Sequence, residues 1–98
     1  MSGPLVVHAT TIALWRGGGW RCVLLRGPSG AGKSGLALRA IQGGWRLVAD
    51  DRTLLWTSGG RLFGRAPDTI AGLIEARGLG VLPVPVLRMG RICLAVDL

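Results

Sequence analysis

The sequence predicts one α/β domain built on a mixed central sheet, and three observations carry that prediction. The chain has 98 residues, of which 49% are hydrophobic and 17% are charged, which suits one small folded domain and excludes a disordered, highly charged chain. Short apolar runs typical of strands recur along it, with one longer run of helical spacing among them. A glycine-rich loop (residues 27–32) joins an apolar run to that helical run, which is the strand–loop–helix arrangement of α/β proteins.

The first half of the chain predicts two strands and a helix. Residues 5–15 are rich in β-branched and apolar residues and are expected to be extended. The glycines at 17–19 predict a hairpin-like turn into a second strand over 21–26, which is apolar enough to be buried on both faces. Residues 33–42 carry apolar residues at helical spacing and predict a helix, which the two following glycines end.

The second half predicts shorter elements. Four strand-like runs are expected, at 46–49, 53–57, 61–63 and 92–96. The glycine-containing segment 58–60 predicts a hairpin between the second and third of these strands. Asp68 or Thr69 is expected to cap a short helix that reaches Arg77. Two prolines in 81–86 indicate an edge strand or a connector.

The formal net charge of +7 is interpreted as a basic surface without a dedicated partner. All basic residues except Lys33 are arginines, and they are scattered along the chain, which argues against a nucleic-acid partner. The alternative is that the summed field attracts acidic proteins or nucleotides. No apolar run of about 18 residues is present, so the sequence predicts no membrane span, and the N-terminal residues do not form a signal-peptide pattern.

The two cysteines indicate structural thiols. Cys22 and Cys93 both lie inside apolar runs, and we expect buried free thiols in a reducing cytoplasm. A zinc site is not expected, because zinc takes about four nitrogen or sulfur ligands and the chain offers one histidine and two cysteines.

One motif carries recognisable chemistry. The residues Gly27-Pro28-Ser29-Gly30-Ala31-Gly32-Lys33-Ser34 match the phosphate-binding P-loop pattern G-x-x-x-x-G-K-[ST] at every fixed position. Glycines let backbone N–H groups face an anion, and the following helix adds its positive N-terminal end. Lys33 is expected to reach the β- and γ-phosphates, and Ser34 to ligate Mg²⁺. The alternative, a glycine-rich turn with an incidental lysine, is less favoured because the flanking runs agree with the motif and Lys33 is the only lysine in the chain.

Acidic residues are few, and two of them are adjacent. Asp50 and Asp51 follow an apolar strand-like run, where a carboxylate near a phosphate site can hold Mg²⁺ or its water, orient an attacking group or act as a general base. The alternative is a turn in which aspartate is simply a good turn former. Without further context, the position of His8 is more typical of a half-buried structural histidine than of a catalytic one. The spacing of Glu75 and Arg77 is likewise more typical of a surface ion pair.

Four segments resemble, in order and spacing, the C-terminal catalytic domain of HPr kinase/phosphorylase. They are His8, the P-loop pattern at 27–34, Leu47-Val48-Ala49-Asp50-Asp51-Arg52 and Ile74-Glu75-Ala76-Arg77-Gly78-Leu79-Gly80. The resemblance runs from about Val6 to Leu98. It implies a P-loop nucleotide-binding domain over residues 1–98, similar to the compact α-proteobacterial type without the family's N-terminal domain. The chain stops directly after a strand-like run, which is consistent with a missing C-terminal portion.

The resemblance implies a bacterial cytoplasmic protein-serine kinase that uses ATP and Mg²⁺. Proteins of this family phosphorylate a serine of HPr, a small phosphocarrier protein of the sugar phosphotransferase system, and so regulate carbon metabolism. Many of them reverse the reaction with inorganic phosphate. They are typically hexamers with the protein substrate bound near a neighbouring subunit, so the resemblance implies a homo-oligomer.

The same match implies a role for each site residue. Asp50 would be the general base toward the serine hydroxyl, Asp51 would support it, and His8 would lie against the carboxylate pair. Ser34 and Glu75 would help hold Mg²⁺, and Arg77 would contact phosphate or order the loop of Glu75. The ATP phosphates would be held by the P-loop residues Gly27, Pro28, Ser29, Gly30, Ala31, Gly32, Lys33 and Ser34.

Two other functions stay open at this point. The first is a nucleotide-binding regulatory module of weak catalytic power, which binds ATP and reports the energy state of the cell to a partner. The second, less favoured, is a small-molecule kinase, which usually needs a lid and a longer chain. An assay with labelled ATP and a phosphocarrier protein separates the kinase from the regulatory module, because the module would bind ATP without transfer.

Overall fold

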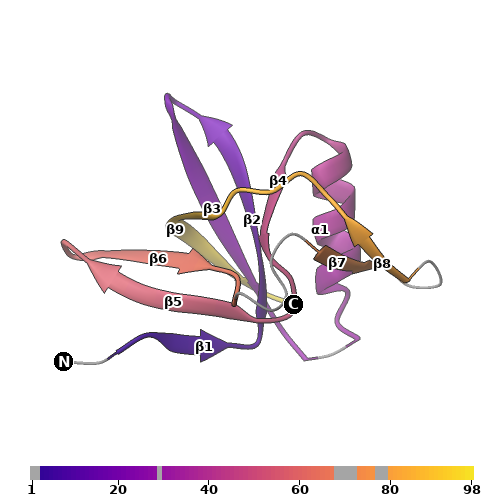
Figure 1. Ribbon diagram of the computed structural model, residues 1–98, viewed down its shortest axis with the longest axis horizontal. Coiled ribbons are helices and arrows are strands. Elements are labelled where there is room, and N and C mark those ends of the chain that lie inside the picture. Colours follow the sequence, from indigo (N-terminus) through magenta and orange to yellow (C-terminus); the bar gives the residue numbers. More distant parts are fainter. Residues whose placement is uncertain (1–2, 29, 68–72, 77–79) are drawn as a thin grey trace.

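The computed structural model describes residues 3–28, 30–67, 73–76 and 80–98, which form a curled sheet with a helix on one side (Figure 1). The sheet has seven strands in the order β1-β5-β6-β9-β3-β2-β4, and a second sheet pairs β7 with β8. The predicted α/β class with a mixed central sheet is confirmed. In chain order the elements are β1 (Leu5–Val7), β2 (Ala9–Arg16), β3 (Gly19–Arg26), α1 (Lys33–Gln42), β4 (Arg46–Ala49), β5 (Thr53–Ser58), β6 (Arg61–Arg65), β7 (Leu73–Ala76), β8 (Gly80–Pro83) and β9 (Met89–Asp97).

Both predicted hairpins form, and their glycines explain why. Gly17 and Gly18 have φ of 62° and 80° between β2 and β3, and Gly59 and Gly60 have φ of 59° and 75° between β5 and β6. Positive φ at both central residues matches the twist of paired strands and is open to glycine without steric cost. The predicted helix 33–42 and strand 46–49 are also confirmed.

The predicted first strand, residues 5–15, divides at His8 into two strands with different neighbours. β1 pairs antiparallel with β5, whereas β2 pairs antiparallel with both β3 and β4. β1 is mostly exposed, and the first five residues of β2 are buried. The chain bends because one straight strand could not pair with β5 and also with β3 and β4. His8 lies at this bend, between β1 and β2.

The prediction of a helix reaching Arg77 is wrong for residues 73–76. These residues form β7, which pairs antiparallel with β8 from Leu73 opposite Pro83 to Ala76 opposite Gly80. Tertiary packing explains the difference, because Ile74 is fully buried in the core that also contains Ala37 of α1. The proposed cap residues Asp68 and Thr69 lie outside the described residues, as does Arg77.

The prediction for residues 81–86, an edge strand or a connector, is confirmed in both its parts. Residues up to Pro83 belong to β8, at the edge of the small sheet. The following segment runs beside β4: the Leu47 N–H donates to the Pro85 carbonyl at 2.9 Å, and the Leu87 N–H donates to the Leu47 carbonyl at 2.9 Å.

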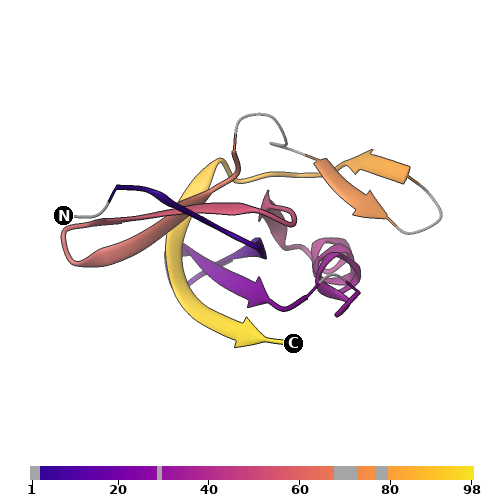
Figure 2. The same cartoon turned by 90° about the horizontal axis from the view of Figure 1, so that it is seen from below.

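Strand β9 holds the large sheet together. Its first residues, 89–91, pair antiparallel with β6, and residues 92–97 pair parallel with β3. The bend between these two parts gives the sheet its curl, as the yellow strand in Figure 2 shows. Gly90 lies just before this bend and gives β9 room to pass Cys22, because a Cβ atom at this position would lie 2.5 Å from the Cys22 Sγ.

The core lies on both faces of β2, β3 and β4. Successive strand residues point to opposite faces, so Ile12 and Leu47 pack toward α1, whereas Ala13 and Val48 pack on the other face with Cys22. Burial raises the pKa of the Cys22 thiol to about 11, and the charge of the Cys93 thiolate adds to the rise, so Cys22 stays protonated at neutral pH. The expected burial of Cys93 is wrong, because its side chain is exposed on β9.

The topology brings one set of strand ends together. β2 runs antiparallel to β3 and β4, so the start of β2 lies beside the ends of both neighbours. The glycine-rich loop leaves β3 at this end and leads into α1, and the chain leaves β4 here as well. None of the helical structure in the described ranges reaches the length and apolarity needed to cross a bilayer.

Candidate functional site

The glycine-rich loop makes a tight connection between β3 and α1. Gly30 and Gly32 have φ of 86° and 92°, values that favour glycine, and Gly32 is the N-cap of the helix. The Ala31 N–H donates to the Pro28 carbonyl at 3.0 Å, and the Leu36 N–H donates to the Gly32 carbonyl at 2.9 Å, which starts the helix. Ser29 lies outside the described residues.

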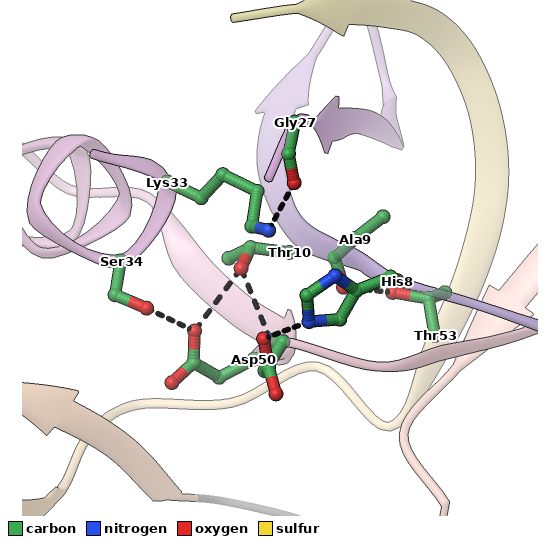
Figure 3. Close-up of polar contacts among 9 residues, drawn as sticks. His8, Ala9, Thr10, Gly27, Lys33, Ser34, Asp50 and Thr53 are labelled. Atoms are coloured by element: carbon green, nitrogen blue, oxygen red, sulfur yellow. Dashed lines mark hydrogen bonds and ion pairs between the residues drawn. The ribbon is translucent and has the colours of Figure 1, made fainter. Parts of the chain in front are cut away.

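Lys33 is the first residue of α1, and its side chain folds back over the start of the loop. Its side chain is buried, with 5% of the residue exposed, and Nζ donates to the Gly27 carbonyl oxygen at 2.5 Å (Figure 3). The first turn of α1 contains no acidic residue. The ammonium and the positive end of the helix dipole therefore lie together at this loop.

Asp50 follows β4 and receives hydrogen bonds from two other elements. Ser34 Oγ of α1 donates to Asp50 Oδ1 at 2.7 Å, and Thr10 Oγ1 of β2 donates to the same oxygen at 3.1 Å. Asp50 is only 7% exposed. The first predicted aspartate is thus directly joined to the last residue of the P-loop pattern, as Figure 3 shows.

Asp51 turns the other way and pairs with His8. Its Oδ1 lies 2.6 Å from Nε2 of His8, and both side chains are about half exposed. The Asp51 backbone has φ of 67°, a left-handed conformation that costs a non-glycine residue roughly 1–2 kcal/mol. The Arg52 N–H, which donates to the Asp50 carbonyl at 2.7 Å, helps to hold this turn.

Thr10 is a site residue that sequence reasoning missed. It is fully buried, donates to Asp50 Oδ1, and accepts a hydrogen bond from the Asp51 N–H at 3.1 Å. The available signal was its position two residues after His8 in an extended run, which places both side chains on one side of the backbone.

The remaining predicted residues are not joined to this site by the described contacts. Glu75 lies in β7 opposite Val81 of β8. Arg77 lies outside the described residues. Across the part of the chain that the structure describes, no three His, Cys, Asp or Glu residues are grouped closely enough to hold a metal ion.

These features define an α/β domain in which a glycine-rich strand–loop–helix unit lies against a pair of aspartates. The model of the HPr Serine kinase C-terminal domain family matches residues 4–89. The chain therefore belongs to this family, which confirms the resemblance that the sequence motifs indicate.

Curated proteins and a solved structure agree with this assignment. The HPr kinase/phosphorylase of Clostridium tetani is 46% identical over 65 residues, which cover 66% of this chain and 21% of that protein. The HPr kinase/phosphorylase of Mycoplasmopsis pulmonis is 40% identical over 78 residues, which cover 80% of this chain and 24% of that protein. The structure of the Hpr(Ser) kinase/phosphatase from Coxiella burnetii matches with a TM-score of 0.83 and 28% identity, over 95% of this chain and 58% of that one. The matched segment thus covers less than a quarter of the length of either curated relative.

Proposed function

We propose that this chain is the catalytic domain of a cytoplasmic, ATP-dependent protein-serine kinase acting on an HPr-like phosphocarrier protein. The observation that carries the proposal is the 2.7 Å hydrogen bond from Ser34 Oγ to Asp50 Oδ1, which joins the phosphate-binding motif to a buried carboxylate. The similarity to proteins named HPr kinase/phosphorylase supports the choice of HPr as substrate. Reversal with inorganic phosphate, assembly into a homo-oligomer such as a hexamer and a regulatory role in carbon metabolism belong to the same proposal.

The charge at the loop suits a triphosphate. Lys33 has three N–H donors, of which the bond to Gly27 uses one, and the helix N-terminus adds partial positive charge. Gly30 and Gly32 leave room for close approach, because a Cβ built at either glycine meets no atom within 4 Å. The ATP phosphates would be held by these groups and by the remaining residues of the P-loop pattern.

The donor set at Ser34 suits Mg²⁺. Its hydroxyl oxygen is a hard donor beside the Asp50 carboxylate, and magnesium sites commonly take one or two protein oxygens and complete the set with phosphate oxygens and water. Ser34 would be one ligand, and Glu75 remains the proposed second. When bound, the ion would neutralise charge that develops on the transferred phosphoryl group.

Asp50 is the proposed general base. Its carboxylate would take the proton of the seryl hydroxyl while the seryl oxygen bonds to the γ-phosphorus of ATP. The bond from that phosphorus to the β–γ bridging oxygen breaks, and ADP leaves. Asp51, held by His8, would support the orientation of the pair, and Arg77 would contact phosphate or order the loop of Glu75.

A substitution at Asp50 tests this function. Asp50→Asn keeps an oxygen acceptor for Ser34 and Thr10 but cannot take a proton, so transfer of labelled phosphate from ATP to HPr should fall about 10²–10⁴-fold. The matched control is Asp97→Asn, which removes the negative charge of an exposed two-contact ion pair with Arg26 (Oδ1 to Nε, 2.8 Å; Oδ2 to Nη2, 3.1 Å) and should keep the parental rate within about twofold.

Three other outcomes of this experiment would contradict the proposal, one in the variant and two in the parent chain. Unchanged transfer by Asp50→Asn would overturn its role as base. If the parent binds MgATP and never transfers phosphate, the regulatory module is the better function. If it neither binds nor transfers, both functions are wrong.

A further inference from the structure

We propose that Thr10 is a positioning residue, whose hydroxyl sets the Asp50 carboxylate and the Asp51 turn in one fixed arrangement for catalysis. The catalytic part of this inference rests on the proposed function above. Its carrying observation is that one buried oxygen atom, Thr10 Oγ1, is hydrogen-bonded to both aspartates, to the side chain of one and to the backbone of the other.

The direction of these hydrogen bonds follows from the chemistry of the partners. The Asp51 N–H can only donate, so Thr10 Oγ1 accepts at 3.1 Å. An ionised carboxylate can only accept, so the single hydroxyl proton of Thr10 points to Asp50 Oδ1, also at 3.1 Å. Thr10 is fully buried, so solvent does not compete for either bond. The hydroxyl rotor therefore has one orientation, and it defines where Oδ1 lies.

The same hydroxyl stabilises an unfavourable backbone. Asp51 has φ of 67°, and such a conformation persists only where surrounding contacts hold it. The bond from its N–H to Thr10 is one such contact, and the pairing of its side chain with His8 is another. His8 and Thr10 are two residues apart, so one short segment at the start of β2 contacts both aspartates.

The adjacent residue gives a matched control. Thr11 is also fully buried in β2, but its hydroxyl lies 2.8 Å from the Thr53 hydroxyl, which in turn donates to the Ala9 carbonyl at 2.9 Å. Thr11 thus has the same chemistry and burial as Thr10, and its hydrogen-bond partner, Thr53, lies on β5 rather than in the aspartate pair.

Three variants of the full chain test the inference. Thr10→Val removes the hydroxyl at nearly constant volume, Thr10→Ser restores it, and Thr11→Val removes the control hydroxyl. Transfer from MgATP to HPr is measured as kcat and KM separately. Thr10→Val should lower kcat about 10–100-fold with the KM for MgATP within about twofold, Thr10→Ser should recover most of kcat, and Thr11→Val should keep kcat within about twofold.

Amide hydrogen exchange at Asp51 tests the hydrogen bond from its N–H to Thr10 without requiring phosphate transfer. In Thr10→Val this amide should exchange at least roughly tenfold faster than in the parent, and in Thr10→Ser and Thr11→Val it should stay close to the parental rate. If the parent transfers no phosphate but Asp51 exchange still depends on the Thr10 hydroxyl, the proposed function is wrong and the structural part of the positioning role is confirmed.

Three results would overturn the inference. The first is Asp51 exchange that is equal in the parent and in Thr10→Val. The second is a kcat in Thr10→Val within about twofold of an active parent. The third is an equal loss of kcat in Thr11→Val, because a merely structural effect of a buried threonine predicts this pattern.

Discussion

The Asp50 carboxylate receives hydrogen bonds from hydroxyl groups on two different elements, α1 and β2, which pack against each other in the core. Ser34 approaches from α1, and Thr10 approaches from β2. Core packing sets the positions of both elements, so the side-chain rotamer of Asp50 is determined by the fold around it. In the proposed mechanism, a general base oriented in this way needs little rearrangement when substrate arrives.

Lys33 gives a direct test of the glycine-rich loop. Lys33→Met keeps the buried aliphatic stem and removes the ammonium, so affinity for MgATP should fall at least about tenfold in calorimetric titration. The free energy of unfolding should change by no more than about 1.5 kcal/mol, because the side chain makes one described hydrogen bond, to Gly27.

The control for Lys33 lies on the same helix. Arg39→Met removes an exposed charge in the last turn of α1 and should leave MgATP affinity within about twofold. Equal affinities of the parent and Lys33→Met would show that the loop does not bind phosphates in the proposed way.

Most residues that the structure brings together at the candidate site could be selected from the sequence, because they lie in contiguous segments. Lys33 and Ser34 follow the loop directly, and the two aspartates follow a strand-like run. Thr10 could not be found in this way, because its role depends on a contact with Asp50 across 40 positions of the sequence. Such a contact exists only once β2 and β4 pair.

Among the elements, β7 was the one whose type the sequence misassigned. Leu73–Ala76 is four residues long, which is too short for helical and strand periodicity to be told apart. Pairing with β8 and burial of Ile74 near α1 determine its conformation. The hairpins and α1, in contrast, carry their turn and cap glycines in the sequence itself, so their local chemistry was sufficient.

At the junction of β3 and β9, one added methyl group is expected to lower the stability of the fold. Gly90→Ala should lower the free energy of unfolding by about 1–3 kcal/mol in urea titration, because the new Cβ would lie 2.5 Å from Cys22 Sγ. Cys22→Ala in the same chain should recover part of that loss, as expected for residues in direct contact.

Gly35→Ala is the matched comparison for Gly90→Ala and should raise the free energy of unfolding rather than lower it. Gly35 lies in α1, and a Cβ there meets only the tip of Arg39 at 3.9 Å, so alanine should stabilise the chain by about 0.5–1 kcal/mol. If Gly90→Ala were as stable as the parent, the close approach of β9 to Cys22 would be wrong.

Across the whole molecule, the backbone amides in the middle of the large sheet should be the most protected from hydrogen exchange. β2 and β3 each have a paired strand on both sides, whereas β1 is a mostly exposed edge strand of three residues. Native-state hydrogen exchange should therefore be roughly 100-fold or more slower for the central amides of β2 and β3 than for those of β1. Equal rates in β1 and β2 would contradict this arrangement.

The sheet order also has a consequence for biosynthesis. Without β9, the order separates into two pieces, β1-β5-β6 and β3-β2-β4, and no other strand pairing among the described residues joins them. The second piece contains the strand that leads into the glycine-rich loop. During synthesis, the two pieces of the large sheet can therefore join only after residues 89–97 have left the ribosomal exit tunnel, and their joining depends on long-range strand pairing.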